Sequence, residues 1–416
     1  MDFNGSALLL TAFIAVLAPL ICALPARLRL PMVAVEVGLG ILVGPNVLGW
    51  ATPTGMLGLL GHLGMIFLFY LAGMEIELST FRGRPLKLAV TGWVLSAGIA
   101  FGLTALLYAV GFCQSPLLIA VATCTTAIGA LLPILRDTGE LNSAFGRHVL
   151  AAGAIGEFGP IILVSLLLTR EHTRWEQTAL MLGFVVVSLV ASGIALIPRP
   201  TRLETFLERT MNAPSQLPVR IAILVLATLV VLAEDFGMDM ILGAFAAGMV
   251  TSLGTKGGAA RQLHSKLEAI GFGFLIPMFF VTSGMHFDLA TLFRSHSSWL
   301  RVPVFLAILM IARAAPTILY RYELDTRDRL PFALYSATSL PLMIAIAEIG
   351  TATGRMQPGN AAALVAAGMI SVVLFPSLAY LLRTRGKQTI PAAASSPGGQ
   401  KLDFARRVEE RSNPNV

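Results

Sequence analysis

Residues 149–168 read VLAAGAIGEFGPIILVSLLL, an apolar stretch of membrane-spanning length that contains a single charged residue, Glu157. A charge near the middle of such a helix costs about 2.5 to 3.5 kcal/mol on insertion scales. A chain keeps a carboxylate there when the carboxylate itself handles a charge, most often a proton or a cation. Glu157 is therefore the first candidate functional residue of the sequence.

The residues around the acid predict a second ligand. Gly156 precedes it, and Gly159 and Pro160 follow it. Because proline has no N–H, Pro160 cannot donate the helical hydrogen bond to the carbonyl group of Gly156, four residues earlier. We expect this free carbonyl oxygen and the carboxylate of Glu157 to act together as ligands of a small cation.

The composition indicates a polytopic membrane protein. Of 416 residues, 56% are hydrophobic and 13% are charged, and the mean hydropathy is +0.77. The loops are short and leave no room for a soluble catalytic domain. We predict thirteen spans, at about 5–24, 31–49, 55–78, 86–112, 115–136, 146–169, 176–198, 217–234, 239–253, 268–285, 300–320, 329–349 and 359–382.

Basic residues alternate between the two sides of the predicted membrane topology. The loops after odd-numbered spans, with the start of the tail, hold about 20 Lys and Arg, and the other loops hold about 5. The positive-inside rule places the N-terminus outside and the C-terminus in the cytoplasm, in a cell membrane. The net charge of +7 is thus a topology signal, and we expect no nucleic-acid partner.

The tail, 384–416, is rich in Pro, Ala, Ser and Gly and then in charge, which predicts a disordered cytoplasmic segment. It contains no GxGxxG, so we expect no nucleotide-binding regulatory domain in the chain.

Two predicted spans share an unusual pattern. The fifth contains Thr123-Cys124-Thr125-Thr126 with Pro133 beyond it, and the twelfth contains Thr338-Ser339-Leu340-Pro341. Both are hydroxyl-rich apolar segments interrupted by proline, and each lies in the middle of a group of three spans. Corresponding interrupted helices in two halves of a chain are typical of transporters built from inverted repeats.

Several segments, taken in order, resemble the cation:proton antiporter-2 family of the sodium/proton exchanger superfamily, which includes Kef-type potassium efflux proteins. The resemblance covers about residues 5 to 382. The matching segments are Leu30-Pro31, Gly44-Pro45-Asn46-Val47-Leu48-Gly49, 64–69 with Gly73-Met74-Glu75, Thr125-Thr126, 146–157, 242–248, and Pro277-Met278-Phe279-Phe280-Val281 with Gly284-Met285.

The resemblance implies an all-α exchanger domain over 1–383 that forms a homodimer in the lipid bilayer. A core of helices at about 86–169 and 300–382 would move against dimerisation helices at about 5–78 and 217–285, with a linker helix at about 176–198. Two unwound helices would cross within the core. The ion-binding acid of the family matches Glu157, and its basic residue on the eleventh span matches Arg313.

The implied activity is exchange of protons for Na⁺ or K⁺ by an elevator motion, with no cofactor. The chain departs from the family at Gly156, because relatives usually have a polar residue before the acid. This gap leaves open a proton-coupled antiporter of another substrate, such as an organic cation. An intramembrane enzyme is not expected, since the chain has no HExxH and no pair of membrane aspartates.

The other candidate residues allow two interpretations each. Arg313 is either a counter-ion that competes with the transported cation at Glu157 or a structural charge partner of that acid. Thr125 and Thr126, with Thr338 and Ser339 as secondary candidates, either contribute to the ion site at the crossed helices or only bond back to their own helices.

Overall fold

The computed structural model describes residues 5–23, 31–75, 83–141, 143–168, 183–184, 186–188, 190–193, 209–255, 257–287 and 296–388. Within these ranges the regular structure is helical and no strand occurs. Eight helical segments within these ranges are long and apolar enough to cross a membrane, and two of them, Gly257–His286 and Thr326–Ala352, combine consecutive shorter helices. Three shorter apolar helices accompany them. The predicted all-α polytopic fold is confirmed.

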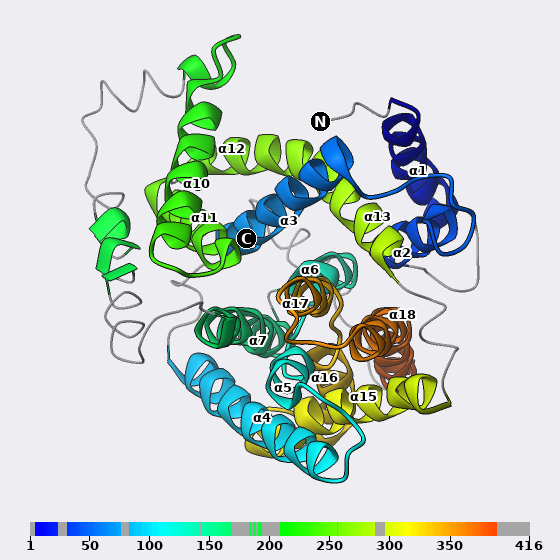
Figure 1. Ribbon diagram of the computed structural model, residues 1–416. Coiled ribbons are helices and arrows are strands. Elements are labelled where there is room, and N and C mark those ends of the chain that lie inside the picture. The colour runs from blue at the N-terminus through cyan, green and yellow to red at the C-terminus, as the bar shows by residue number, and fades with distance from the viewer. Residues whose placement is uncertain are drawn as a thin grey trace, which may run out of the picture.

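The helices form two groups, which lie in the upper and lower halves of Figure 1. The first group comprises α1 (Gly5–Ala23), α2 (Met32–Val43), α3 (Gly55–Glu75), α10 (Leu217–Asp235), α11 (Met240–Gly254), α12 (Gly257–Ile270) and α13 (Ile276–His286). The second comprises α4 (Arg84–Ala109), α5 (Pro116–Thr123), α6 (Ile128–Asp137), α7 (Ala144–Leu168), α15 (His296–Ala314), α16 (Thr326–Ser336), α17 (Pro341–Ala352) and α18 (Pro358–Gln388).

Helices pack closely within each group. In the first group, Gly73 of α3 and Gly248 of α11 bring the two backbones together, because a Cβ at either position would collide with the backbone of the opposite helix. Between the groups, α7 contacts α11 and α2 contacts α18. At the first of these places Phe158 stacks on Phe245 with ring centroids 5.3 Å apart.

Most predicted spans coincide with described helices, and the differences have local causes. The second helix ends at Val43 rather than near residue 49, because Gly44 and Pro45 cannot continue it. The tenth begins earlier, at Gly257, as the amphipathic helix α12, which joins α13 through a π-helical turn at Gly271–Leu275. The polar residues of α12 lower the hydropathy of this segment, so hydropathy alone did not predict the extension.

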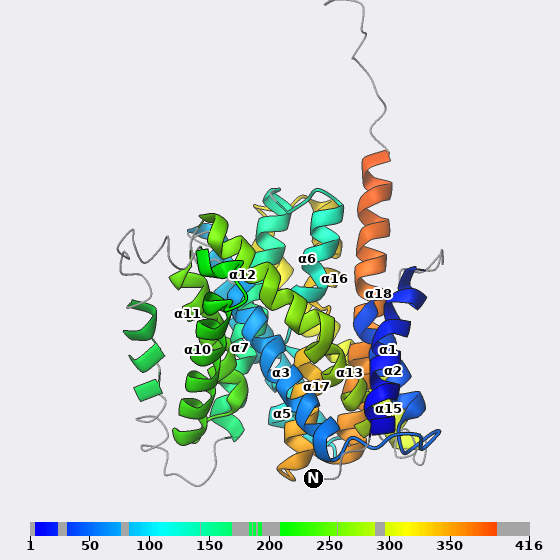
Figure 2. The same cartoon turned by 90° about the horizontal axis from the view of Figure 1, so that it is seen from above.

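Two predictions concern the remaining segments. The span at 176–198 lies mostly outside the described residues, so the linker helix stays a prediction. The tail was expected to begin at residue 384, but α18 continues through Gln388 (Figure 2). Residues 389–416 lie outside the described part of the chain.

Arg383 near the end of α18 joins three segments of the second group. Its guanidinium donates to Glu140 Oε1 at 2.8 and 3.1 Å and to Asp328 Oδ1 at 2.7 Å. It also lies over the ring of Phe145, with its Cζ 3.6 Å from the ring centroid. The side chains of Arg383 and Glu140 are only 11% and 8% exposed. This cluster therefore ties α18 to α16 and to the segment between α6 and α7.

Replacing Arg383 with Ala is expected to lower the free energy of unfolding by about 3 to 5 kcal/mol, because the buried carboxylate of Glu140 loses this partner. Thermal unfolding of the purified protein in detergent measures the change. Arg84→Ala is the control, since the Arg84–Glu323 pair has an arginine that is 67% exposed and such pairs contribute about 0 to 1 kcal/mol. Equal destabilisation by the two variants would contradict the prediction.

Candidate functional site

Two broken helices meet in the middle of the second group. The chain is unwound at 124–127, between α5 and α6, and at 337–340, between α16 and α17. In Figure 2, α6 and α16 lie above α5 and α17, so the two broken helices run in opposite directions. The predicted pair of interrupted helices is confirmed.

The two unwound segments are bonded to each other. The N–H of Ala127 donates to the carbonyl of Thr338 at 2.8 Å. The hydroxyl of Thr126 donates to the carbonyl of Ser336 at 2.6 Å, and the hydroxyls of Thr125 and Ser339 share a short hydrogen bond. These bonds satisfy backbone and side-chain groups that the interrupted helices leave without helical partners.

The crossing brings four helix ends together. The C-terminal ends of α5 and α16 present partially negative carbonyl groups, and the N-terminal ends of α6 and α17 present partially positive N–H groups. Opposite charges are therefore stabilised at different points of the same crossing.

Glu157 lies at one of the positive ends. The residue is 8% exposed, and its Oε2 accepts a hydrogen bond from the N–H of Ile128, the first residue of α6, at 3.3 Å. An anion at a helix N-terminus gains favourable interaction with the helix dipole. The sequence predicted that Glu157 lies at the broken helices. It did not predict that the N-terminal end of α6 is the partner of this carboxylate.

Gly156 lies against the other unwound segment. Pro160 lies inside α7, and the carbonyl oxygen of Gly156 accepts a hydrogen bond from the N–H of Thr126 at 3.0 Å. The oxygen is thus at the crossing, but it is not free as expected, because the N–H of Thr126 takes the place of the missing helical donor. Its predicted role as an ion ligand stays a prediction.

The missing side chain at position 156 leaves no open space. A Cβ there would lie 2.6 Å from Nη2 of Arg313 and 2.6 Å from Oγ1 of Thr126. The expectation that this gap makes room for an organic cation is therefore wrong at this position, because the arginine and threonine side chains fill the space.

Arg313 bonds to neutral groups. Its Nε donates to the carbonyl of Ser336 at 3.1 Å, and its Nη2 donates to Oγ1 of Thr126 at 2.5 Å. Weaker bonds of 3.3 Å reach Oγ of Ser96 and the carbonyl of Ala152. The guanidinium thus lies at the negative C-terminal end of α16.

The expected ion pair between Arg313 and Glu157 is absent. The ion pairs of 4.0 Å or less within the described ranges do not include these two residues. The physical reason is that each charge has its own helix end and hydrogen-bond partners at the crossing. Arg313 still lies beside Gly156, so it remains a neighbour of the acid without contacting it directly.

The hydroxyl residues have different roles. Thr125, Thr126 and Ser339 bond across the crossing, as described above. The hydroxyl of Thr338 donates to the carbonyl of Leu334 in its own helix at 3.0 Å, which is the second of the two expected interpretations. The carbonyl group of Thr338, in contrast, takes part in the crossing by accepting from Ala127. Ion ligation by any of these hydroxyls is still untested.

Three residues that contact the crossing were not predicted from the sequence. Trp93 of α4 donates its ring N–H to the carbonyl of Cys124 at 3.2 Å, and Ser96 of the same helix accepts from Arg313. Ser371 of α18 accepts from the N–H of Ser339 at 3.1 Å and donates to its carbonyl at 2.7 Å. Single polar side chains in apolar helices were the available signal.

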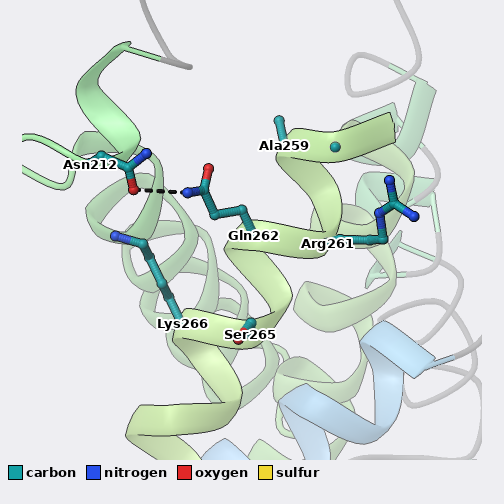
Figure 3. Close-up of a pocket in the computed structure, with 7 residues that line it drawn as sticks. Asn212, Ala259, Arg261, Gln262, Ser265 and Lys266 are labelled. Atoms are coloured by element: carbon teal, nitrogen blue, oxygen red, sulfur yellow. Dashed lines mark hydrogen bonds between the residues drawn. The ribbon is translucent and has the colours of Figure 1, made fainter.

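A surface pocket of about 800 Å³ lies on α12 (Figure 3). It shares no lining residue with the crossing. Gln262 donates to Oδ1 of Asn212 at 2.8 Å, and Lys266 donates to the carbonyl of Met211 at 2.7 Å. None of the residues that line the pocket belongs to the predicted ion site.

The fold and the site define a polytopic membrane transporter with two crossed, broken helices. The sequence profile of the family "Sodium/hydrogen exchanger, transmembrane" matches residues 12–381. The chain therefore belongs to the sodium/hydrogen exchanger family, and the resemblance to cation:proton antiporters is confirmed at this level. Members of this family are transporters rather than enzymes, in agreement with the sequence analysis.

Relatives in bacteria and plants are similar over much of the chain. The Bacillus cereus Na⁺/H⁺-K⁺ antiporter GerN is 27% identical over 63% of this chain and 67% of its own length. Cation/H⁺ antiporter 17 of Arabidopsis thaliana is 27% identical over 93% of this chain. The chain spans 48% of that plant protein and 60% of YjbQ, a Bacillus subtilis relative that is 26% identical to it.

A solved structure has the same fold. The sodium/proton antiporter MjNhaP1 of Methanocaldococcus jannaschii superposes with a TM-score of 0.66, covering 91% of this chain and 98% of its own, at 16% sequence identity.

Proposed function

We propose that this protein exchanges protons for a monovalent cation, Na⁺ or K⁺, across the cell membrane, and that Glu157 binds the two in turn. The observation that supports the proposal most directly is the buried carboxylate of Glu157 at the crossing of two broken helices. Sodium, potassium and proton are also the ions in the names of its relatives.

The charges of the crossing favour an electroneutral exchange of one cation for one proton. With Glu157 ionised, its negative charge and the positive charge of Arg313 sum to zero. With either a proton or a monovalent cation bound, the same residues carry one net positive charge. Because the two loaded states are equal in charge, the membrane potential would not favour one over the other.

An elevator motion of the second helix group against the first completes the proposal. Glu157 precedes Phe158, which stacks on Phe245 of the first group, so the site lies next to the boundary between the groups. The first group would form the homodimer interface, and the N-terminus would lie outside the cell. Closed apolar packing at this boundary would shield the carboxylate during the motion.

The test uses purified protein in proteoliposomes with a pH-sensitive dye inside. Na⁺ or K⁺, but not choline, is expected to drive proton movement, with the same rate when the membrane potential is clamped at different values. Proton movement driven by an organic cation, with no response to Na⁺ or K⁺, would replace this proposal with the alternative substrate. No cation-driven movement at all would contradict both.

A further inference from the structure

Arg313 is a buried charge with an unusual set of partners. Arg313 is 4% exposed. The acceptors of its hydrogen bonds are two hydroxyls and two carbonyl groups. No carboxylate within the described ranges forms an ion pair with it. A buried charge is costly unless it is well hydrogen-bonded, and two of the four bonds, at 3.3 Å, are long.

A small cavity adjoins the guanidinium. Its volume is about 10 Å³, and it lies between α4, α7, α16 and the 3-10 turn at Ala315–Tyr320. Gly92, Trp93, Ser96, Arg313, Tyr320 and Ser336 are among the residues that line it. This is about the space that one buried water molecule needs, and such a water requires two to four polar partners.

Ser336 supplies an independent sign of a ligand. It is 4% exposed, and its Oγ makes no hydrogen bond to another protein group. Its carbonyl oxygen, in contrast, accepts from both Arg313 and Thr126. A buried hydroxyl that lacks a hydrogen-bond partner destabilises the fold. Ser336 is also one of the residues that line this cavity.

We infer that this cavity is a binding site for one water molecule, which joins Arg313 to Oγ of Ser336 and to the hydroxyls of Ser96 and Tyr320. The water accepts a hydrogen bond from the guanidinium on the side formed by α4. It thereby holds the positive charge among neutral partners and away from Glu157. Gly92 and Ser336 are thus positioning residues for cation exchange; this kinetic role, unlike the water site itself, rests on the proposed function.

Gly92→Ala is the sharpest probe of the site. Its Cβ would lie 3.4 Å from Cβ of Pro316 and 3.7 Å from the hydroxyl oxygen of Tyr320, so the methyl group fits into the cavity without a clash and takes the place of the water. The guanidinium then loses an acceptor and turns toward Glu157, where it competes with the cation. The cation concentration at half-maximal exchange is expected to rise about threefold to tenfold, with little change in maximal rate.

Two further variants make the comparison specific. Gly98→Ala lies on the same helix with no atom near its Cβ, and it is expected to leave the exchange kinetics unchanged. Ser336→Ala removes one partner of the water and is expected to raise the half-maximal concentration as Gly92→Ala does. Because both act through one water, the double variant should be no worse than either single variant.

The water itself is observed in a density map of the wild-type protein at a resolution that shows ordered waters, by crystallography or cryo-electron microscopy. A peak within hydrogen-bond distance of Arg313 and Oγ of Ser336, absent in Gly92→Ala, supports the inference. An empty cavity in the wild type, or additive kinetic effects in the double variant, overturns it. If the wild type exchanges no cation, the proposed function fails, while the density still decides the water site.

Discussion

Glu157→Gln is expected to abolish cation-driven proton movement, with a loss of at least about 100-fold. The amide has nearly the same shape and keeps an oxygen that can accept the hydrogen bond from the N–H of Ile128, so the crossing stays intact. It cannot ionise, however, and therefore neither releases a proton nor supplies a negative charge to a cation. A hydrogen bond to a charged group is worth about 1.5 to 3 kcal/mol, which by itself corresponds to a loss of about 10- to 150-fold in cation affinity.

The measurement is cation-induced proton movement in everted membrane vesicles, with equal amounts of wild type and variant confirmed by immunoblot. Glu268→Gln is the matched control, because this acid on α12 has a side chain that is 42% exposed, and its loss is expected to leave exchange unchanged. Thermal unfolding should give similar midpoints for wild type and Glu157→Gln. Exchange at the wild-type level in Glu157→Gln would exclude this residue as the carrier of the proton and cation.

The sequence predicted those features of the site that depend on local chemistry. A lone carboxylate in an apolar stretch identified Glu157, and hydroxyl-rich segments followed by proline identified both breaks, at 124–127 and 337–340. Each of these signals exists within about twenty residues of chain. Their local nature is the reason why no structure was needed to find them.

The features that the sequence did not predict depend on which residues meet across the fold. Opposite charges on two core helices suggested that Arg313 pairs with Glu157, but a helix end is also a charge partner, and its position is set by tertiary packing. Ser96 and Ser371 lie on α4 and α18, which adjoin the broken helices in the chain. Their contacts with the crossing depend on how these two helices pack around it, which the sequence does not specify.

The structure gives a physical reason for the glycine at position 156, where the family usually has a polar residue. In the sequence it is a missing polar side chain beside the acid. In the structure it is the point at which the backbone of α7 approaches Thr126, with the Nη2 of Arg313 on the same side. Its role is therefore to admit two other side chains, and that role leads to a testable consequence.

Gly156→Ala is expected to lower the free energy of unfolding by about 1 to 3 kcal/mol, the usual cost of overpacking, and to reduce exchange at least about tenfold by disturbing the site. The new methyl carbon would lie 2.6 Å from both Nη2 of Arg313 and Oγ1 of Thr126. Neither atom can retreat freely, because they bond to each other at 2.5 Å and Oγ1 also donates to the carbonyl of Ser336. Thermal unfolding and exchange in proteoliposomes measure the two effects.

Two comparisons separate this collision from a general effect of alanine in a helix. Gly129→Ala in the first turn of α6 has no atom near its Cβ, so it is expected to leave stability unchanged or to raise it by up to about 1 kcal/mol through helix propensity. In a Thr126→Ala background the colliding oxygen is gone, and Gly156→Ala should then cost less than it does in the wild type. Two substitutions are coupled only when their atoms interact. If the losses in free energy of unfolding caused by Gly156→Ala and Thr126→Ala simply add, a side chain at position 156 does not collide with Thr126, and the prediction is contradicted.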